Sequence, residues 1–374
     1  MSLSISDEQS LTTYIQQIKF QSGGVKLKSL IDLQKYPLKI ADLIYPEICM
    51  KVGMQLEELL HDTSTAILAY ESAINYWDKR GESFISDLYV IATYNHLLSL
   101  YSSLQDYNKI DSLYEKIKKR FFSENSWAPE YKAGIICSYI RSLENRRLFS
   151  NIDNEYDLAL SFISTISIDD LKDNLHAQIL HQRGNMYIER AFSENHPESA
   201  YKIFIEKAND CLCKSMDLFK KLEEINPYKY RNKYLEVRHD IGNLHHDLGN
   251  NEMALYIFES IYTEFESEFG KQDHEDFYTE DEIVLHTMYS LSFMYNDLGK
   301  YEQSEELLEK VLKMRRIQFL ENKLLFAEEM AKCTYEMARL YGRMGKDIKL
   351  VESLYNKSIE YYTLLSGKLP EIAK

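Results

Sequence analysis

The chain has 374 residues, with 44 Lys and Arg against 59 Asp and Glu, for a formal net charge of -15. That excess of negative charge argues against a nucleic-acid backbone or an anionic membrane as the main partner. Hydrophobic residues make up 45% of the chain, whereas only 13 Gly and 6 Pro are present. Because an all-β protein needs frequent turns, this shortage of turn residues favours helices.

Residues 1–43 carry two stretches of helical composition, DEQSLTTYIQQIKF and VKLKSLIDLQKY, separated by QSGG. They match nothing in the rest of the chain, and we predict a helical cap or a small bundle here. The segment has neither the basic start nor the apolar stretch of a secretory leader, and no run of about 18 apolar residues follows it. These features predict a cytoplasmic protein without a membrane-spanning helix.

Four segments further along the chain share one series of apolar, small and aromatic side chains. They are residues 91–119, 235–262, 285–312 and 331–358. Each segment contains two amphipathic stretches separated by a short turn. Apolar residues recur in both stretches at spacings of three and four, which predicts two helices per segment.

Residues 235–262 illustrate the series. Ile241, Gly242 and His245 place a large, a small and an aromatic side chain on one face of the first helix. Gly249 can take the positive φ that ends this helix, and Ala254 lets the second helix approach closely. The series resembles the tetratricopeptide repeat. The resemblance implies an all-α fold, a right-handed superhelical solenoid of antiparallel helix pairs whose neighbours stack to bury their apolar faces.

We count about seven such units over residues 44–374. Their starts lie near residues 47, 91, 133, 177, 235, 285 and 331, which are 42–58 residues apart. Because the usual repeat has about 34 residues, the extra length predicts longer helices or inserted loops. In the unit that starts near residue 177, the second helix is expected only from Ala208 onward. Residues 264–282 form an acidic insertion, interpreted as a solvated loop or as a contact for a basic partner.

In a tetratricopeptide array the first helices line a concave groove, and Asn185 and Asn243 hold equivalent positions there, each after a glycine. An asparagine side chain can donate to and accept from a peptide backbone, which suits an extended ligand. The alternative is a solvated polar face that tolerates asparagine. The same face in all units gives the predicted groove residues Asn95, Ser99, His181, Asn185, His239, Asn243, His246, Tyr289, Phe293, Asn296, Tyr335, Arg339 and Arg343. The two arginines make one end basic, suited to an acidic side chain or a free carboxylate.

The histidines and cysteines predict no metal site. His239 and His246 share a helix face, but a zinc site needs three or four ligands. His245 takes the aromatic position of the series and is predicted to be a core residue. The five cysteines are scattered, which predicts reduced thiols. Since the chain also lacks a phosphate-binding glycine loop, a nucleophile elbow and a zinc-protease motif, we predict no catalytic residue and no cofactor.

We predict a non-enzymatic scaffold or adaptor that binds a protein or a peptide in the groove, as a regulatory subunit of a bacterial multi-protein system. The order of segments along the chain suggests an alternative function. A helical N-terminal segment before about seven repeats is similar to the peptide-pheromone-responsive regulators of Gram-positive bacteria, especially the aspartyl-phosphate phosphatases of the Rap group. That resemblance implies a response regulator as target and a signalling peptide as ligand. The catalytic glutamine of that group matches no particular one among Gln9, Gln16, Gln17, Gln21 and Gln34.

Overall fold

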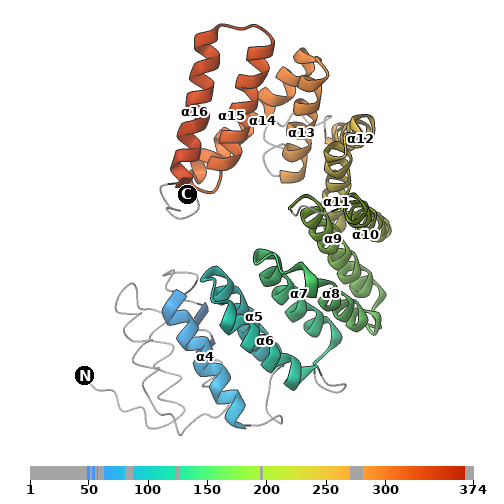
Figure 1. Cartoon of the computed structure of the whole chain (residues 1–374), viewed down its shortest axis with the longest axis vertical. Coiled ribbons are helices and arrows are strands. Elements are labelled where there is room, and N and C mark those ends of the chain that lie inside the picture. The colour runs from blue at the N-terminus through green and yellow to red at the C-terminus, as the bar shows by residue number, and fades with distance from the viewer. Residues whose placement is uncertain are drawn as a thin grey trace, which may run out of the picture. The chain divides into compact units, whose positions relative to one another are not determined.

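The computed structural model describes residues 49–50, 53–54, 57, 63–80, 87–122, 127–193, 197–269 and 281–366. The predicted N-terminal cap and most of the acidic insertion lie outside these ranges. The chain divides into two compact units, Met1–Leu175 and His176–Lys374, called here the N-terminal and the C-terminal unit. The described residues form thirteen labelled helices and no strand (Figure 1). The prediction of an all-α fold of helix pairs is therefore confirmed.

The helices of the N-terminal unit are α4 (Thr63–Arg80), α5 (Asp87–Ser103), α6 (Tyr107–Phe121), α7 (Pro129–Asn145) and α8 (Phe149–Ser164). Helix α9 (Asp169–Ser193) begins there and continues into the C-terminal unit. The remaining helices are α10 (Glu198–Ile225), α11 (Pro227–Asp247), α12 (Asn251–Phe269), α13 (Glu282–Asp297), α14 (Tyr301–Glu321), α15 (Ala327–Arg343) and α16 (Ile348–Ser366). None of the described helices is long and apolar enough to cross a membrane.

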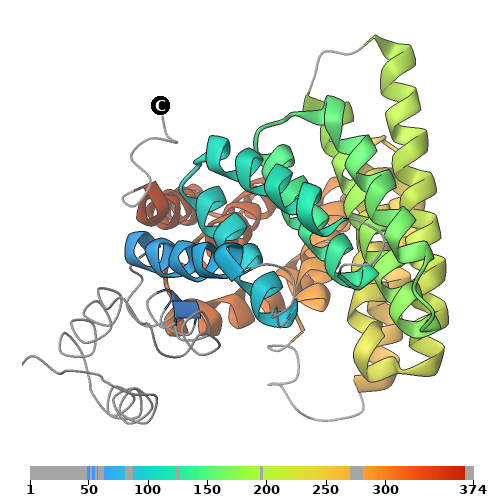
Figure 2. The same ribbon diagram turned by 90° about the horizontal axis from the view of Figure 1, so that it is seen from below.

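The unit that starts near residue 177 gains its extra length in helices. Helices α9 and α10 have 25 and 28 residues, and Figure 2 shows α10, α11 and α12 side by side in green and yellow. The prediction that the second helix begins only at Ala208 is wrong, because α10 already begins at Glu198, directly after Pro197. Proline fixes its own φ and lacks an N–H, so it fits a helix start and not a helix interior.

Three turns of the C-terminal unit, after α11, α13 and α15, end the first helix of a pair in the same way. Gly249, Gly299 and Gly345 have φ of +74°, +74° and +67°. Around Gly249 the backbone N–H of Asn250 donates to the carbonyl of His245 at 2.8 Å, and that of Gly249 donates to His246 at 2.9 Å. This pair of bonds satisfies carbonyls that the helix end leaves open, and it needs a residue in the left-handed region. The three glycines therefore fix where α11, α13 and α15 stop.

The small residues of the series sit where two helices of a pair touch. A Cβ added to Gly242 would lie 2.6 Å from the Phe258 ring, so only glycine fits there without rearrangement. In the next pair, Ser304 is fully buried and its hydroxyl donates to the backbone carbonyl of Ser292 at 2.8 Å. Ala254, the equivalent of Ser304, is also fully buried. Close backbone approach explains why the series requires small side chains at these positions.

The aromatic residues of the series join one pair to the pair before it. The hydroxyl of Tyr295 on α13 donates to Glu259 on α12 at 2.8 Å, and that of Tyr101 on α5 donates to Glu71 on α4 at 2.6 Å. Tyr295 is 8% exposed. His245 occupies the same position but is only half-buried, with its Nδ1 3.4 Å from the side-chain nitrogen of Asn250. The prediction that His245 is a core residue is therefore met only in part, because its ring lies beside the exposed turn residue Asn250.

Candidate functional site

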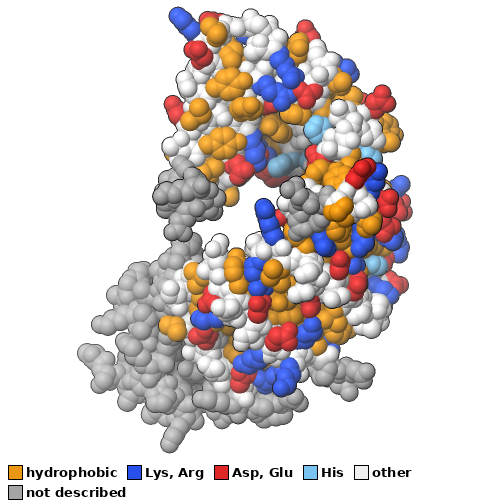
Figure 3. Space-filling view, viewed as in Figure 1, with side chains coloured by type: hydrophobic (Ala, Val, Ile, Leu, Met, Phe, Trp, Pro, Cys, Tyr) orange, Lys and Arg blue, Asp and Glu red, His pale blue; other side chains and the backbone are white. Residues whose placement is uncertain are grey.

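The predicted groove residues of the C-terminal unit lie on the first helices of four successive pairs, α9, α11, α13 and α15. We call these side chains the first-helix face: His181, Asn185, His239, Asn243, His246, Tyr289, Phe293, Asn296, Tyr335, Arg339 and Arg343. Figure 3 shows histidine side chains in pale blue close to basic and acidic ones in this part of the C-terminal unit. Side-chain contacts connect each of the four helices to the next.

Helices α9 and α11 meet at Asp240, which the sequence did not single out. His181 Nε2 lies 2.7 Å from Asp240 Oδ2, and the Asn185 amide donates to the same oxygen at 2.9 Å. Burial acts to raise the pKa of Asp240, but the hydrogen bonds from His181 and Asn185, with His239 nearby, hold that pKa well below its usual range. Asp240 is therefore ionised at neutral pH.

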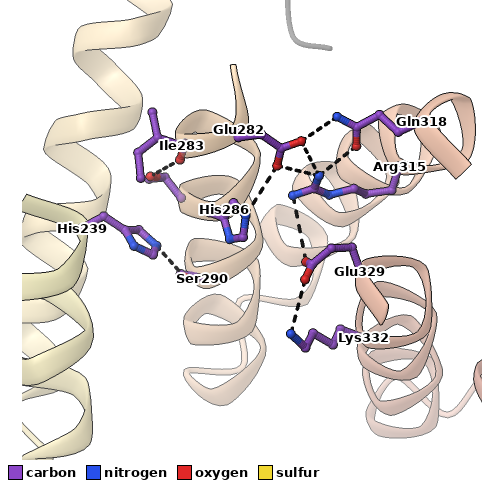
Figure 4. Close-up of polar contacts among 10 residues, drawn as sticks. His239, Glu282, Ile283, His286, Ser290, Arg315, Gln318, Glu329 and Lys332 are labelled. Carbon is purple, nitrogen blue, oxygen red and sulfur yellow. Dashed lines mark hydrogen bonds and ion pairs between the residues drawn. The ribbon is translucent and has the colours of Figure 1, made fainter. Parts of the chain in front are cut away.

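Helices α11 and α13 meet at His239. The Asn243 amide nitrogen lies 3.2 Å from His239 Nδ1. On the other side of the ring, His239 Nε2 lies 3.2 Å from the Ser290 hydroxyl, a contact drawn in Figure 4. An amide nitrogen can only donate, so Nδ1 accepts and the ring proton is on Nε2, which donates to Ser290. This assignment of donor and acceptor follows from the hydrogen-bond partners. Because the side-chain nitrogen of Asn243 faces His239, its side-chain oxygen points away from that ring.

A buried arginine of α14 is bonded to the first turn of α13, the helix that carries Ser290, as Figure 4 shows. Arg315 on α14 is 2% exposed and donates to both carboxylate oxygens of Glu282, at 2.8 and 2.7 Å, and to Gln318 at 2.8 Å. Burial acts to raise the pKa of Glu282, but the hydrogen bonds and charge of Arg315 lower it. His286, one turn after Glu282, has a lowered pKa because of burial and the charge of Arg315. The first turn of α13 is therefore fixed to α14 by a charged hydrogen-bond pair.

Helices α13 and α15 meet at Phe293 and Arg339. The guanidinium of Arg339 lies 4.4 Å from the centroid of the Phe293 ring, and His246 of α11 packs edge-on against the same ring at 5.5 Å. A cation over an aromatic face gains electrostatic energy from the ring quadrupole. Phe293 thus connects three first helices, and both of these neighbours, Arg339 and His246, were predicted to lie on one surface with it.

Both arginines of the predicted basic end are paired within the chain. Arg339 and Arg343 both donate to Asp297 Oδ1, Arg343 at 2.7 Å. Arg343 also donates to the carbonyl of Asn296 at 2.9 Å, and the side chain of Asn296 donates to Glu336 at 2.8 Å. Asn296 is 1% exposed, so it joins α13 to α15 and presents no open face to a ligand. An acidic ligand group would have to compete with Asp297 for these arginines.

The pKa of the Glu336 carboxyl group is shifted in the opposite direction from that of Asp240. Burial raises the pKa of Glu336, with the hydrogen bond from Asn296 opposing the rise. The nearest cation is Arg339, whose Nε lies 3.4 Å from Glu336 Oε1.

The two predicted tyrosines of the first-helix face differ in exposure. Tyr335 is 48% exposed and packs edge-on against Tyr355, with ring centroids 5.5 Å apart. Tyr289 is half-buried, and burial raises its pKa.

No cluster of three or more histidine, cysteine or acidic side chains in the described part of the chain is arranged to hold a metal ion. The five cysteines are free thiols. Burial raises the pKa of Cys333 to about 12 and that of Cys137 to about 11. Neither thiol is activated as a nucleophile, since that would require a lowered pKa.

A family model for the tetratricopeptide repeat matches residues 284–317, which comprise most of α13 and α14. Residues 284–317 form a tetratricopeptide repeat. Comparison with the curated proteins gives no match.

Among solved structures, the chain is similar to BtubC from P. vanneervenii, with 14% identity and a TM-score of 0.47 over 74% of this chain and 91% of that one. It is similar to a tetratricopeptide repeat protein from Parabacteroides merdae, with 14% identity and a TM-score of 0.41 over 84% and 99%. It is similar to a Rap protein in complex with competence and sporulation factor, with 12% identity and a TM-score of 0.29 over 88% and 98%. At these scores no argument about function rests on the three likenesses.

The tetratricopeptide repeat is a scaffold that binds other proteins and is generally not an enzyme. The predicted residues of the C-terminal unit lie on its first helices, but the sequence did not single out their acidic partners there. Asp240 and Glu336 each precede a predicted residue, Asn243 and Arg339, by three positions. That spacing places them on the same helix face, so it was a signal available in the sequence.

The two predicted residues of the N-terminal unit lie on α5. Asn95 is half-buried, and its side-chain oxygen accepts from the Ser138 hydroxyl of α7 at 3.1 Å. Ser99 is exposed. These two side chains therefore lie on first helices, as predicted, but no charged side chain is hydrogen-bonded to either of them within the described residues.

Proposed function

We propose that the protein is a non-enzymatic adaptor that binds an extended segment of a protein, or a peptide, on the first-helix face of the C-terminal unit. The observation that supports this is the orientation of two asparagines. Asn185 donates through its amide nitrogen to Asp240, and Asn243 donates through its amide nitrogen to His239. Both amide oxygens are therefore left without a partner in the described part of the chain, on neighbouring first helices.

These oxygens suit the backbone of an extended chain. A backbone N–H that is taken from water needs an acceptor, and an amide oxygen whose orientation is already fixed loses little entropy when it supplies one. Asp240 and His239 fix the orientation, since each accepts one hydrogen bond from an asparagine side chain. A solvated polar face would need no such support. For this reason we favour a binding role over tolerated surface asparagine.

We further propose that Arg339 and Arg343 contribute when the ligand carries an acidic group near α15. Since both arginines bind one oxygen of Asp297, a ligand carboxylate would share them with Asp297 and not meet free cations. Their contribution should therefore be modest and should weaken as salt is added.

The test compares affinities of the native partner, captured from extracts of the host, for single variants of the full chain. We expect Asn185→Ala and Asn243→Ala to weaken binding about 5- to 150-fold, the cost of an unpaired backbone group of about 1–3 kcal/mol. The matched control is Asn209→Ala, an exposed asparagine on α10, a second helix. Unchanged affinity for both first-helix variants, with thermal melts like that of the unmodified chain, would move the binding surface elsewhere.

We take this adaptor to be a regulatory subunit of a multi-protein system. The alternative function is that of a peptide-responsive regulator of the Rap type. Only the order of segments along the chain supports that alternative, and the glutamines considered for its catalysis lie outside the described residues. A phosphatase of this kind should accelerate the loss of phosphate from a purified response regulator of the host. A scaffold should leave that rate unchanged.

A further inference from the structure

Asp240 on α11 differs from four carboxylates on α13 and α15 in its ion-pair partners. Those four each lie near a lysine or an arginine. These pairs are Glu282 with Arg315 at 2.7 Å, Glu329 with Lys332 at 3.3 Å, Glu336 with Arg339 at 3.4 Å, and Asp297 with Arg343 at 2.7 Å. Among the described residues, no lysine or arginine lies within 4.0 Å of Asp240. Its neighbours are His181, His239 and Asn185.

These neighbours hold Asp240 in place without a lysine or arginine beside it. His181 Nε2 lies 2.7 Å from Asp240 Oδ2, and Asn185 is an uncharged amide that donates to the same oxygen. His239 is engaged elsewhere, because Nδ1 accepts from Asn243 and Nε2 lies 3.2 Å from the Ser290 hydroxyl. A carboxylate that has lost part of its water shell and has no lysine or arginine beside it gains from a cationic ligand group.

The two oxygens of Asp240 are used unequally. Oδ2 accepts from both His181 and Asn185. Oδ1 lies 3.9 Å from His239 Nδ1, beyond hydrogen-bond distance. The Asp240 side chain is 29% exposed, so a ligand can reach it. Oδ1 is thus an oriented acceptor on the carboxylate to which Asn185 donates.

We propose that Asp240 binds a cationic group of the ligand, an ammonium or a guanidinium, and so selects for positive charge at the α9–α11 end of the first-helix face. The proposal rests on the proposed function, since it names the chemistry that one end of that surface recognises. An N⁺–H donor to a carboxylate forms a stronger hydrogen bond than a neutral donor does. With Arg339 and Arg343 on α15, a bound chain would place its basic part at Asp240 and its acidic part at α15.

The test uses an array of random synthetic decapeptides, each made with a free and with an acetylated N-terminus, probed with the full-length chain. If Asp240 binds a side chain, the bound peptides should be enriched in lysine or arginine at one position. If it binds the terminal amine, acetylated peptides should lose binding. For the selected peptides, Asp240→Asn should lower affinity about tenfold to a hundredfold, as for the loss of a charged hydrogen bond. Asn keeps the size and the acceptor for His181.

The matched control is Asp247→Asn, which makes the same charge change on the same helix at an exposed side chain near His246. It should leave affinity within about twofold, because a solvent-exposed charge contributes little. Bound peptides without any preference for positive charge, or equal effects of the two variants, would overturn the role of Asp240 and leave the proposed function intact. Peptides whose binding survives Asn185→Ala and Asn243→Ala, or an array with no binding above background, would overturn both.

Discussion

The two units of the chain build the same turn from different residues. In the C-terminal unit, Gly249 and its equivalents take φ near +70°, whereas in the N-terminal unit Gln105 and Arg147 take φ of +55° and +54°. The hydrogen bonds are alike: the N–H of Asp106 donates to the carbonyl of Tyr101 at 2.9 Å, and that of Asn250 donates to His245 at 2.8 Å. The helix pair thus requires a backbone conformation, and glycine is only the residue that adopts it most easily.

The first-helix faces of the two units also differ. On α5 and α7 the predicted residue Asn95 bonds to Ser138, a neutral contact. In the C-terminal unit, histidines, arginines and carboxylates connect all four first helices. Polar side chains that are already oriented on several neighbouring helices are what a binding surface needs, since a partner then pays less entropy. The comparison favours the C-terminal unit for the proposed binding role and predicts how each unit responds to substitution.

The largest expected effect comes from the aromatic position that both units share. Tyr295→Ala should lower the free energy of unfolding by about 3–5 kcal/mol, as for other large-to-small aromatic substitutions in a core. Tyr101→Ala should cost a similar amount, because both hydroxyls donate to a glutamate on the preceding helix and both rings are buried. Urea unfolding of the two variants measures this. A loss below about 1 kcal/mol for Tyr295→Ala would mean that the register of the repeat is wrong.

Two helical glycines should respond in opposite directions. Gly242→Ala in the C-terminal unit should cost about 1–3 kcal/mol, because the new Cβ would lie 2.6 Å from the Phe258 ring. Gly134→Ala in the N-terminal unit should stabilise the protein by about 0.5–1 kcal/mol, since alanine favours a helix interior and nothing lies within 4 Å of its Cβ. Equal effects in urea unfolding would contradict the close approach of α11 and α12.

Exchanging glycine and glutamine between a turn of each unit should change the free energy of unfolding in opposite directions. Gly299→Gln should destabilise the protein by about 1–2 kcal/mol, because a residue with a Cβ is strained at φ of +74°. Gln105→Gly removes such strain in the N-terminal unit, and the larger chain entropy of glycine in the unfolded state offsets part of the gain. We therefore expect a gain of up to about 1 kcal/mol in chemical unfolding. A loss at Gln105 would show that its side chain contributes more than its backbone strain costs.

The smallest effects concern acid stability and differ in sign between two carboxyl groups. The folded pKa of Asp240 is lowered, so its stabilising contribution is complete above the unfolded value of about 3.9 and is lost as the pH falls through the folded pKa. The difference in stability between the unmodified chain and Asp240→Asn should therefore shrink on acidification below pH about 4.

Glu336 is the matched opposite. Its folded pKa is raised, so it lowers stability as the pH rises above the unfolded value of about 4.3. Glu336→Gln should remove that decline. Thermal melts from pH 3 to pH 7 measure both trends, and trends of the same sign would contradict the assigned burial and hydrogen bonding.

Much of the fold could be predicted from the sequence, because the repeat is a local pattern. Gly299 in the turn, Ser304 at the close approach and Tyr295 on the aromatic position all followed from spacing along single helices. The start of α10 could not be obtained in this way, since the composition of residues 198–207 allows a loop as well as a helix. Pro197 was the available signal.

The site was predictable in part for the same reason. Helical spacing placed Asn185 and Asn243 on one face, but it does not say which side chain of the next helix each one meets. The pairing of Arg343 with Asp297 and Asn296 joins α15 to α13 over 46 and 47 positions in sequence. Only the packing of neighbouring pairs brings such residues together, so the sequence described the basic end as open when its arginines are already bound.

Hydrogen–deuterium exchange of the full chain, with and without the partner captured from the host, tests the central claim most directly. Binding on the first-helix face should slow exchange in the first helices of the C-terminal unit, above all around Asn185, Asn243 and Arg339, and leave the outer second helices such as α12 unchanged. Slower exchange confined to the second helices or to the N-terminal unit would contradict the account.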